Sequence, residues 1–99
     1  MAAKKIYKVR SKVVPYPGMA AWYFAYLDTK KAATIKANHS KSKRGFGSIR
    51  VLVTLGKTKW KTSIFPDKHS GSYVLPLKAA VRRAEGIDAG DSITFTLEI

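Results

Sequence analysis

The sequence predicts a mainly β fold in which two ββαβ halves, residues 5–56 and 57–99, interleave into one closed or nearly closed barrel with two short helices. Several stretches alternate apolar and polar residues with the period of a strand, and the order strand, strand, helix, strand occurs twice. A chain of 99 residues is expected to form one domain, 1–99. Each half alone has too small a core to be stable, and closing the sheet covers its strand edges.

The first half opens with an alternating strand at Lys5–Val14, which ends in a proline-rich turn at Pro15–Gly18. A second strand follows around residues 22–26. Asp28 or Thr29 can cap a helix that runs to about residue 37 and turns Ala32, Ile35 and Thr34 inward. Residues 47–55 then alternate again and form the third strand.

The second half repeats this order, with strands at 59–65 and 72–75, a turn at 66–71 and a last strand at 92–99. Between them we expect a helix at Pro76–Glu85, because proline is favoured at the first helical position. Its apolar stripe is Leu77, Ala80, Val81 and Ala84. Gly86 provides a left-handed ending, and the helix dipole favours Arg82 and Arg83 in the last turn. This helix therefore has structural reasons for its basic residues and is a weak candidate for reading DNA.

Three separated motifs resemble the bacterial family called domain of unknown function 1905: GFGS (45–48), WKTSIFP (60–66) and YVLPLKAAVRRAEGIDAGD (73–91). The resemblance covers most of residues 5–99 and implies a single-chain double-split β-barrel, without an established activity. The last motif is also distantly similar to the swapped-hairpin element of AbrB, MazE and MraZ proteins, which are DNA-binding dimers. The motif residues are Gly45, Phe46, Gly47, Trp60, Ser63, Pro66, Pro76, Arg82, Gly86, Gly90 and Asp91.

Composition narrows the function classes. The chain has no cysteine, which removes disulfides and thiolate chemistry, and its longest apolar run is too short to span a bilayer. The start of the chain has no apolar signal segment, so a cytoplasmic protein without a membrane is expected. We expect no cofactor and no metal, and a monomer rather than an obligate dimer.

Candidate catalytic groups are few, so an enzyme is not expected. His69, Asp67 and Ser63 form the only hydrolase-like set, and a histidine in a polar turn is more often a solvated side chain. Asp88 and Asp91 lie beside Gly90, where a carboxylate commonly accepts backbone N–H groups of a turn. GFGS precedes a strand, whereas a phosphate-binding glycine loop precedes a helix.

Positive charge gathers in residues 1–61, which hold 15 Lys and Arg against one acid, while residues 62–99 hold 4 Lys and Arg against 5 acids. If the first strands of the two halves are neighbours, their cations line one surface and attract phosphate. The candidate nucleic-acid-binding residues are Lys8, Arg10, Lys12, Lys41, Lys43, Arg44, Arg50, Lys57, Lys59 and Lys61. Lysine on outward strand positions also protects a sheet against aggregation at its edges, which is the simpler explanation for the positive charge of these strands.

The sequence thus favours a non-enzymatic module that binds DNA or RNA with little sequence specificity. A protein-interaction or antitoxin-like module and a small-ligand-binding barrel or hydrolase remain alternatives. We expect four aromatic residues in the core: Trp22, Tyr23, Phe24 and Trp60. Because neighbouring residues of a strand face opposite ways, Tyr23 is the one that could instead be exposed and stack on a base.

Overall fold

The computed structural model describes residues 5–15, 22–38, 47–68 and 70–99, and all statements below concern these residues. The elements follow the expected order of strand, strand, helix, strand, repeated once. They are β1 (Ile6–Pro15), β2 (Tyr23–Tyr26), α1 (Thr29–Asn38), β3 (Ile49–Leu55), β4 (Thr58–Asp67), β5 (Ser72–Leu77), α2 (Ala79–Glu85) and β6 (Ser92–Glu98).

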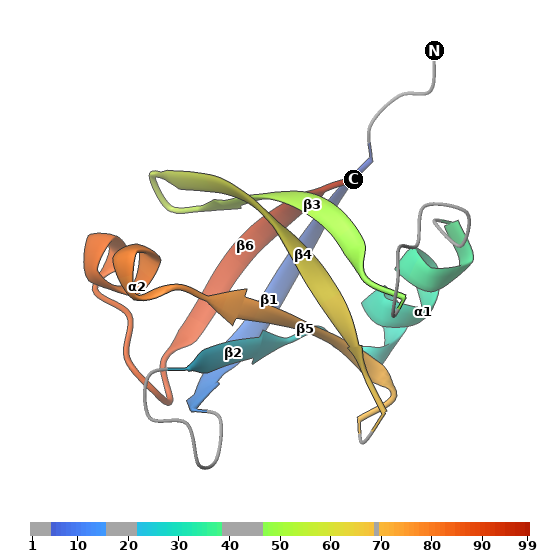
Figure 1. The fold of residues 1–99 in the computed structure, drawn as a ribbon, viewed down its shortest axis with the longest axis horizontal. Helices are drawn as coiled ribbons and strands as arrows, with labels where there is room; N and C mark the ends of the chain where they lie inside the picture. The colour runs from blue at the N-terminus through green and yellow to red at the C-terminus, as the bar shows by residue number, and fades with distance from the viewer. Residues whose placement is uncertain (1–4, 16–21, 39–46, 69) are drawn as a thin grey trace.

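The six strands close into an antiparallel barrel in the order β1, β2, β5, β4, β3, β6 (Figure 1). β1 and β4 each take part in two sheets. The first part of β1 pairs with β6 and its end pairs with β2, while the first part of β4 pairs with β3 and its end pairs with β5. The predicted double-split β-barrel is therefore confirmed, with β1 and β4 as the two strands that join its sheets.

The two halves are related by a pseudo-twofold arrangement of strand pairs. Seven residues of β1 pair with β6, and seven of β4 pair with the corresponding strand β3. Between the halves, β2 pairs with β5 and β3 pairs with β6. Thr54 of β3 lies opposite Thr96 of β6, so equivalent strands meet in the middle of one sheet.

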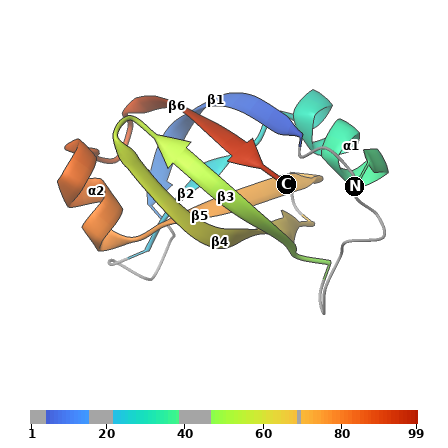
Figure 2. The same ribbon diagram turned by 90° about the horizontal axis from the view of Figure 1, so that it is seen from above.

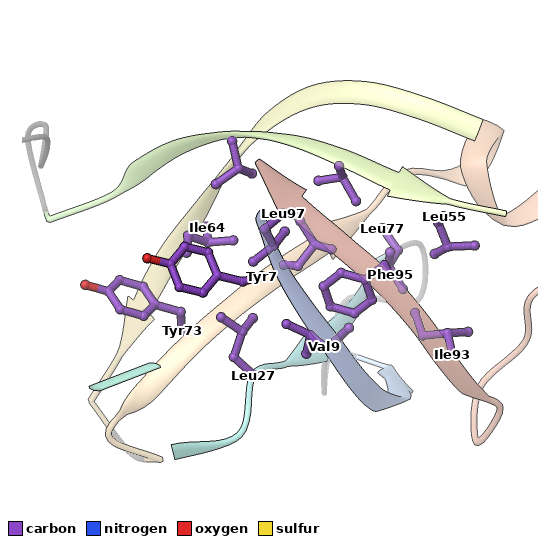
Figure 3. Packing of buried hydrophobic residues seen from close by; sticks show 14 of the residues in the cluster. Tyr7, Val9, Leu27, Leu55, Ile64, Tyr73, Leu77, Ile93, Phe95 and Leu97 are labelled. Atoms are coloured by element: carbon purple, nitrogen blue, oxygen red, sulfur yellow. The ribbon is translucent and has the colours of Figure 1, made fainter. Parts of the chain in front are cut away.

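Alternating residues of the strands fill the barrel interior. Figure 3 shows Val9 of β1, Ile64 of β4, Leu77 of β5, and Phe95 and Leu97 of β6 pointing inward. Burial of such side chains contributes roughly 1.5–3 kcal/mol each. Tyr73 is also buried in this cluster, and its burial raises the pKa of the hydroxyl. The strand period thus determined which side chains form the core.

The two helices lie at opposite ends of the barrel (Figures 1 and 2). At the start of α1 the Asp28 carboxylate accepts the Lys31 N–H at 2.7 Å, which confirms Asp28 as the cap. Ala32 and Ile35 are buried as expected, whereas Thr34 is exposed and its hydroxyl donates to the Lys30 carbonyl at 3.0 Å. The expectation that Thr34 faces inward was wrong.

The second helix begins later than expected. Pro76 belongs to β5, where it lies opposite Phe24, and α2 starts at Ala79 with Lys78 as its cap. Leu77 is buried as a strand residue, and Ala80 and Ala84 are exposed, so only Val81 of the expected stripe packs inward from the helix. A proline φ suits an extended strand end as well as a helix start, and burial of Leu77 favours the strand.

Candidate nucleic-acid interface

The outward side of β1, β6, β3 and β4 carries most of the cations that the sequence singled out. Their inward neighbours are core residues, so alternation turns the basic side chains to solvent. We call this surface the basic face. It consists of Lys8, Arg10, Lys12, Arg50, Lys59 and Lys61, all exposed, with Thr54, Thr94 and Thr96 between them.

One row of paired residues crosses the whole basic face. Lys8 lies opposite Thr96, Thr96 opposite Thr54, and Thr54 opposite Lys59. Adjacent strands are about 4.8 Å apart, so two lysines border a short hydroxyl-lined strip three strand spacings wide. Arg10 and Lys61 extend the two margins. Among the outward positions of these four strands in the described residues, the acids are Glu98 on β6 and Asp67 at the end of β4.

The expectation that the first strands of the two halves are neighbours was wrong. β1 and β4 are not neighbours, because two strands separate them in either direction around the barrel. Pseudo-symmetry places equivalent first strands on opposite sides of the ring. Their cations nevertheless share one four-stranded sheet, at its two margins, with threonines instead of direct contact between them.

The remaining basic candidates lie elsewhere or cannot be placed. Lys57 is exposed in the turn between β3 and β4 and is separate from the strand rows. Lys41, Lys43 and Arg44 lie outside the described residues, as do Gly45 and Phe46 of the family motif.

Arg82 of α2 has a structural role. Its guanidinium carbon lies 3.9 Å from the centre of the Tyr23 ring, and its Nε donates to the Leu77 carbonyl at 3.3 Å. These contacts join α2 to β2 and to the end of β5. Arg82 is half-buried, whereas Arg83 is exposed. The structure therefore supports the interpretation of this helix as a folding device.

Other motif residues also shape the barrel. Gly86 ends α2 in the left-handed conformation with φ 63°, as predicted. At Gly90, φ is 89° and the N–H donates to the Val13 carbonyl at 2.7 Å, while the Asp91 carboxylate accepts the Asp88 N–H at 2.8 Å. The Gly-Asp pair is thus part of the turn that leads from α2 into β6, and this turn is hydrogen-bonded to Val13 of β1.

The other family positions lie on or beside β4. Gly47 has φ 88°, a conformation that favours glycine, and a Cβ there would make an ordinary contact with Pro66 at 3.4 Å. Trp60 points inward and packs on the core, and its buried Nε1 has no hydrogen-bond partner among the described residues. Ser63 points outward, opposite Arg50.

The expectation for the aromatic residues was partly wrong. Tyr23 points inward, beneath Arg82, whereas Trp22 is 49% exposed and Phe24 points outward, with 6.2 Å between the Trp22 and Phe24 ring centres. The reason is that β2 has apolar residues on both faces, so the alternation does not reveal which face is inside. The exposed side is the one that carries Trp22.

The outward side of the other sheet is apolar, which the sequence reasoning missed. Two rows cross it: Val14, Phe24 and Pro76 in one, and Tyr26, Val74 and Phe65 in the other. Phe65 is 43% exposed. The only signal was the apolar character of both faces of β2 and β5. We call this surface the aromatic face: Val14, Trp22, Phe24, Tyr26, Phe65, Val74 and Pro76.

Two members of the hydrolase-like set, Asp67 and Ser63, lie on β4. The Asp67 carboxylate accepts the Ser70 N–H at 3.2 Å, as a turn residue does, and Ser63 lies further back on β4. His69 lies outside the described residues. Within the described ranges no group of three His, Asp or Glu residues gathers as metal ligands, and no helix is long and apolar enough to cross a membrane.

A closed six-stranded barrel with a basic face and an aromatic face defines the chain as a small β-barrel whose conspicuous surfaces lie on its strands. The chain belongs to the family described as Domain of unknown function (DUF1905), whose model matches residues 10–97. This confirms the family resemblance of the three motifs. No curated protein matches the chain.

Proposed function

We propose that this protein is a non-enzymatic module that binds nucleic acid through the basic face with little sequence specificity. The observation that carries the proposal is the row Lys8, Thr96, Thr54, Lys59, which brings cations from both halves to the two margins of one sheet. Phosphates of a nucleic-acid backbone recur along a strand, and a surface with spaced cations and hydroxyl groups binds such an anion without reading bases.

The charge of the whole chain supports the same partner. A net charge of +13 attracts polyanions over long range and speeds their association at low salt. Six of the cations are exposed on the basic face, on β1, β3 and β4, whereas the acids at the described outward positions of β1, β6, β3 and β4 are Glu98 and Asp67. Solvated faces ordinarily mix both signs, so this imbalance favours a phosphate-rich partner.

Little sequence specificity follows from the short helices. A helix that reads the major groove places several side chains on base edges. α2 has seven residues, and Arg82 is engaged with Tyr23 and Leu77. α1 has ten residues, and its buried side chains face the barrel. Contacts from strand cations to phosphates carry no base information.

Fluorescence anisotropy with labelled 20-nucleotide DNA and RNA at 50 to 200 mM salt tests the proposal. We expect binding at low salt that weakens as salt rises, with a logarithmic slope of about −3 to −4 if about four phosphates are contacted. The double variant Lys8→Gln, Lys59→Gln should reduce the magnitude of this slope by about 1.4 to 1.8, because each lost phosphate contact removes about 0.7 to 0.9.

The matched control is Lys30→Gln, Lys36→Gln, which removes the same charge from exposed positions of α1. This control should bind more tightly than the variant of the basic face. Absence of binding at 50 mM salt contradicts the proposal, and so does an equal loss in both double variants.

The alternative of a protein-interaction module draws support from the apolar aromatic face, since exposed apolar patches commonly mark binding surfaces. A ligand-binding barrel or hydrolase has less support, because Asp67 is used in its turn. Purification of the protein with a bound protein and without affinity for nucleic acid would favour the first alternative.

A further inference from the structure

We infer that the nucleic acid is single-stranded and that its bases stack on the aromatic face. This inference rests on the proposed function and names its substrate class. The two rows of the aromatic face bring Phe24, Tyr26 and Phe65 outward from β2 and β4, and Trp22 lies beside Phe24. Aromatic rings on strands are platforms on which successive bases of a single strand stack.

The basic face and the aromatic face are continuous. On β1 the outward residue Lys12 is followed by outward Val14, and on β4 outward Lys61 is followed by Ser63 and then Phe65. Outward residues two apart on a strand are about 6.6 Å apart, which is close to the spacing of phosphates along a nucleic acid. A single-stranded nucleic acid whose phosphates contact the basic face can therefore place its bases on the aromatic rings without leaving the protein surface.

A groove at the edge of the aromatic face provides a further contact for a base. It lies where β5 diverges from β4 before α2, has a volume of about 410 Å³, and is lined by Trp22, Phe65, Pro76, Leu77 and Lys78 among others. This volume is typical of small-ligand sites. Lys78 is exposed, so the groove combines apolar walls with one cation, and the described residues that line it include no acid.

The charge of the chain and the exposed rings favour a single-stranded nucleic acid, over a second copy of the chain or a duplex, as the partner of the aromatic face. A second copy of a chain with net charge +13 is repelled by the first, which opposes self-association through this face. In a duplex the faces of the bases are stacked on one another and are not accessible to protein rings. An unpaired strand offers both free base faces and phosphates.

The test compares a (dT)12 single strand with a hairpin duplex, using anisotropy at 100 mM salt. The wild-type protein should bind (dT)12 more tightly than the duplex. The double variant Trp22→Ala, Phe65→Ala should weaken (dT)12 binding by roughly tenfold or more, because each stacked base contributes substantially to affinity. Its duplex affinity and its salt slope should stay within about twofold.

Ile6→Ala is the matched control, since Ile6 is also a large exposed apolar residue, at 64%, but lies outside the aromatic face. It should bind (dT)12 as the wild type does. Trp22→Phe, Phe65→Tyr keeps the rings and should retain the preference for (dT)12. Thermal unfolding of each variant checks that the barrel remains folded.

Fluorescence gives a second measurement. The chain has two tryptophans, so Trp60→Phe leaves Trp22 as the sole tryptophan, whose emission is excited selectively at the red edge of indole absorption. Its emission should fall when (dT)12 is added and should change little with the hairpin duplex, because stacking on a base quenches an indole.

The possible failures are distinguishable. Equal binding of single strand and duplex, with no effect of the ring variant, overturns stacking while the proposed function stands. Absence of binding to either probe at low salt overturns the proposed function itself. A stable dimer that Trp22→Ala, Phe65→Ala converts to a monomer also overturns the inference, because the aromatic face is then covered by a second copy.

Discussion

Arg82 and Arg83 are adjacent in α2 and have different surroundings. The guanidinium of Arg82 lies over the Tyr23 ring and its Nε donates to the Leu77 carbonyl, whereas the described contacts of the exposed Arg83 include none of this kind. A cation over an aromatic ring contributes roughly 0.5–2 kcal/mol, and a hydrogen bond about 1 kcal/mol. Arg82 therefore stabilises the attachment of α2, although the sequence alone makes both arginines look alike.

Arg82→Ala should lower the free energy of unfolding by about 1–3 kcal/mol, while Arg83→Ala should change it by at most about 0.5 kcal/mol. Urea denaturation measures both. The two variants lose the same charge, so at a temperature where both are folded they should bind nucleic acid equally. A larger loss of binding in Arg82→Ala would put α2 in the interface and contradict its purely structural role.

At the scale of elements, the β3–β4 turn is connected to the end of α2. The Thr58 hydroxyl donates to the Glu85 carboxylate at 2.6 Å, and a Cβ on Gly56 would overlap that carboxylate. Gly56 also has φ 59°, a conformation that favours glycine. The contact positions a short helix that buries little of its own surface, since Val81 is its buried residue.

Gly56→Ala should destabilise the protein by about 1 kcal/mol more than Gly71→Ala. Both glycines have positive φ, but at Gly71 no atom lies within 4 Å of a built Cβ, so only Gly56→Ala also displaces Glu85 and breaks its hydrogen bond. In a Glu85→Ala background the difference should disappear. Equal unfolding midpoints for the two glycine variants in the wild-type background would show that the Thr58 contact is not stabilising.

At the scale of the whole molecule, the parts predicted from sequence are those set by local periodicity. The two-residue period of a strand assigns Tyr7 and Val9 to one face of β1 and Lys8 and Arg10 to the other. The structure places the first pair inside the barrel and the second pair outside. Gly86 was likewise predictable because a helix end requires its positive φ.

The rest depends on contacts between distant residues. No local pattern determines that β6 and β3 lie between β1 and β4, because strand order is set by the closure of the barrel. Nor does a local pattern determine which side of β2 is buried, since Phe24 and Tyr23 are both aromatic and only the packing of Tyr23 against Leu77 and Arg82 distinguishes them. For this reason the basic surface was anticipated and the aromatic face was not.

The basic face and the aromatic face together are proposed to hold one single-stranded nucleic acid. Titration of the isotope-labelled protein with (dT)12, followed by backbone and indole N–H chemical shifts, tests this most directly. We expect shifts along β1, β2 and β4 and at the exposed Trp22 indole, with the Trp60 indole, whose Nε1 is buried, unchanged. Shifts confined to α1 and α2, with both indoles unchanged, would contradict it.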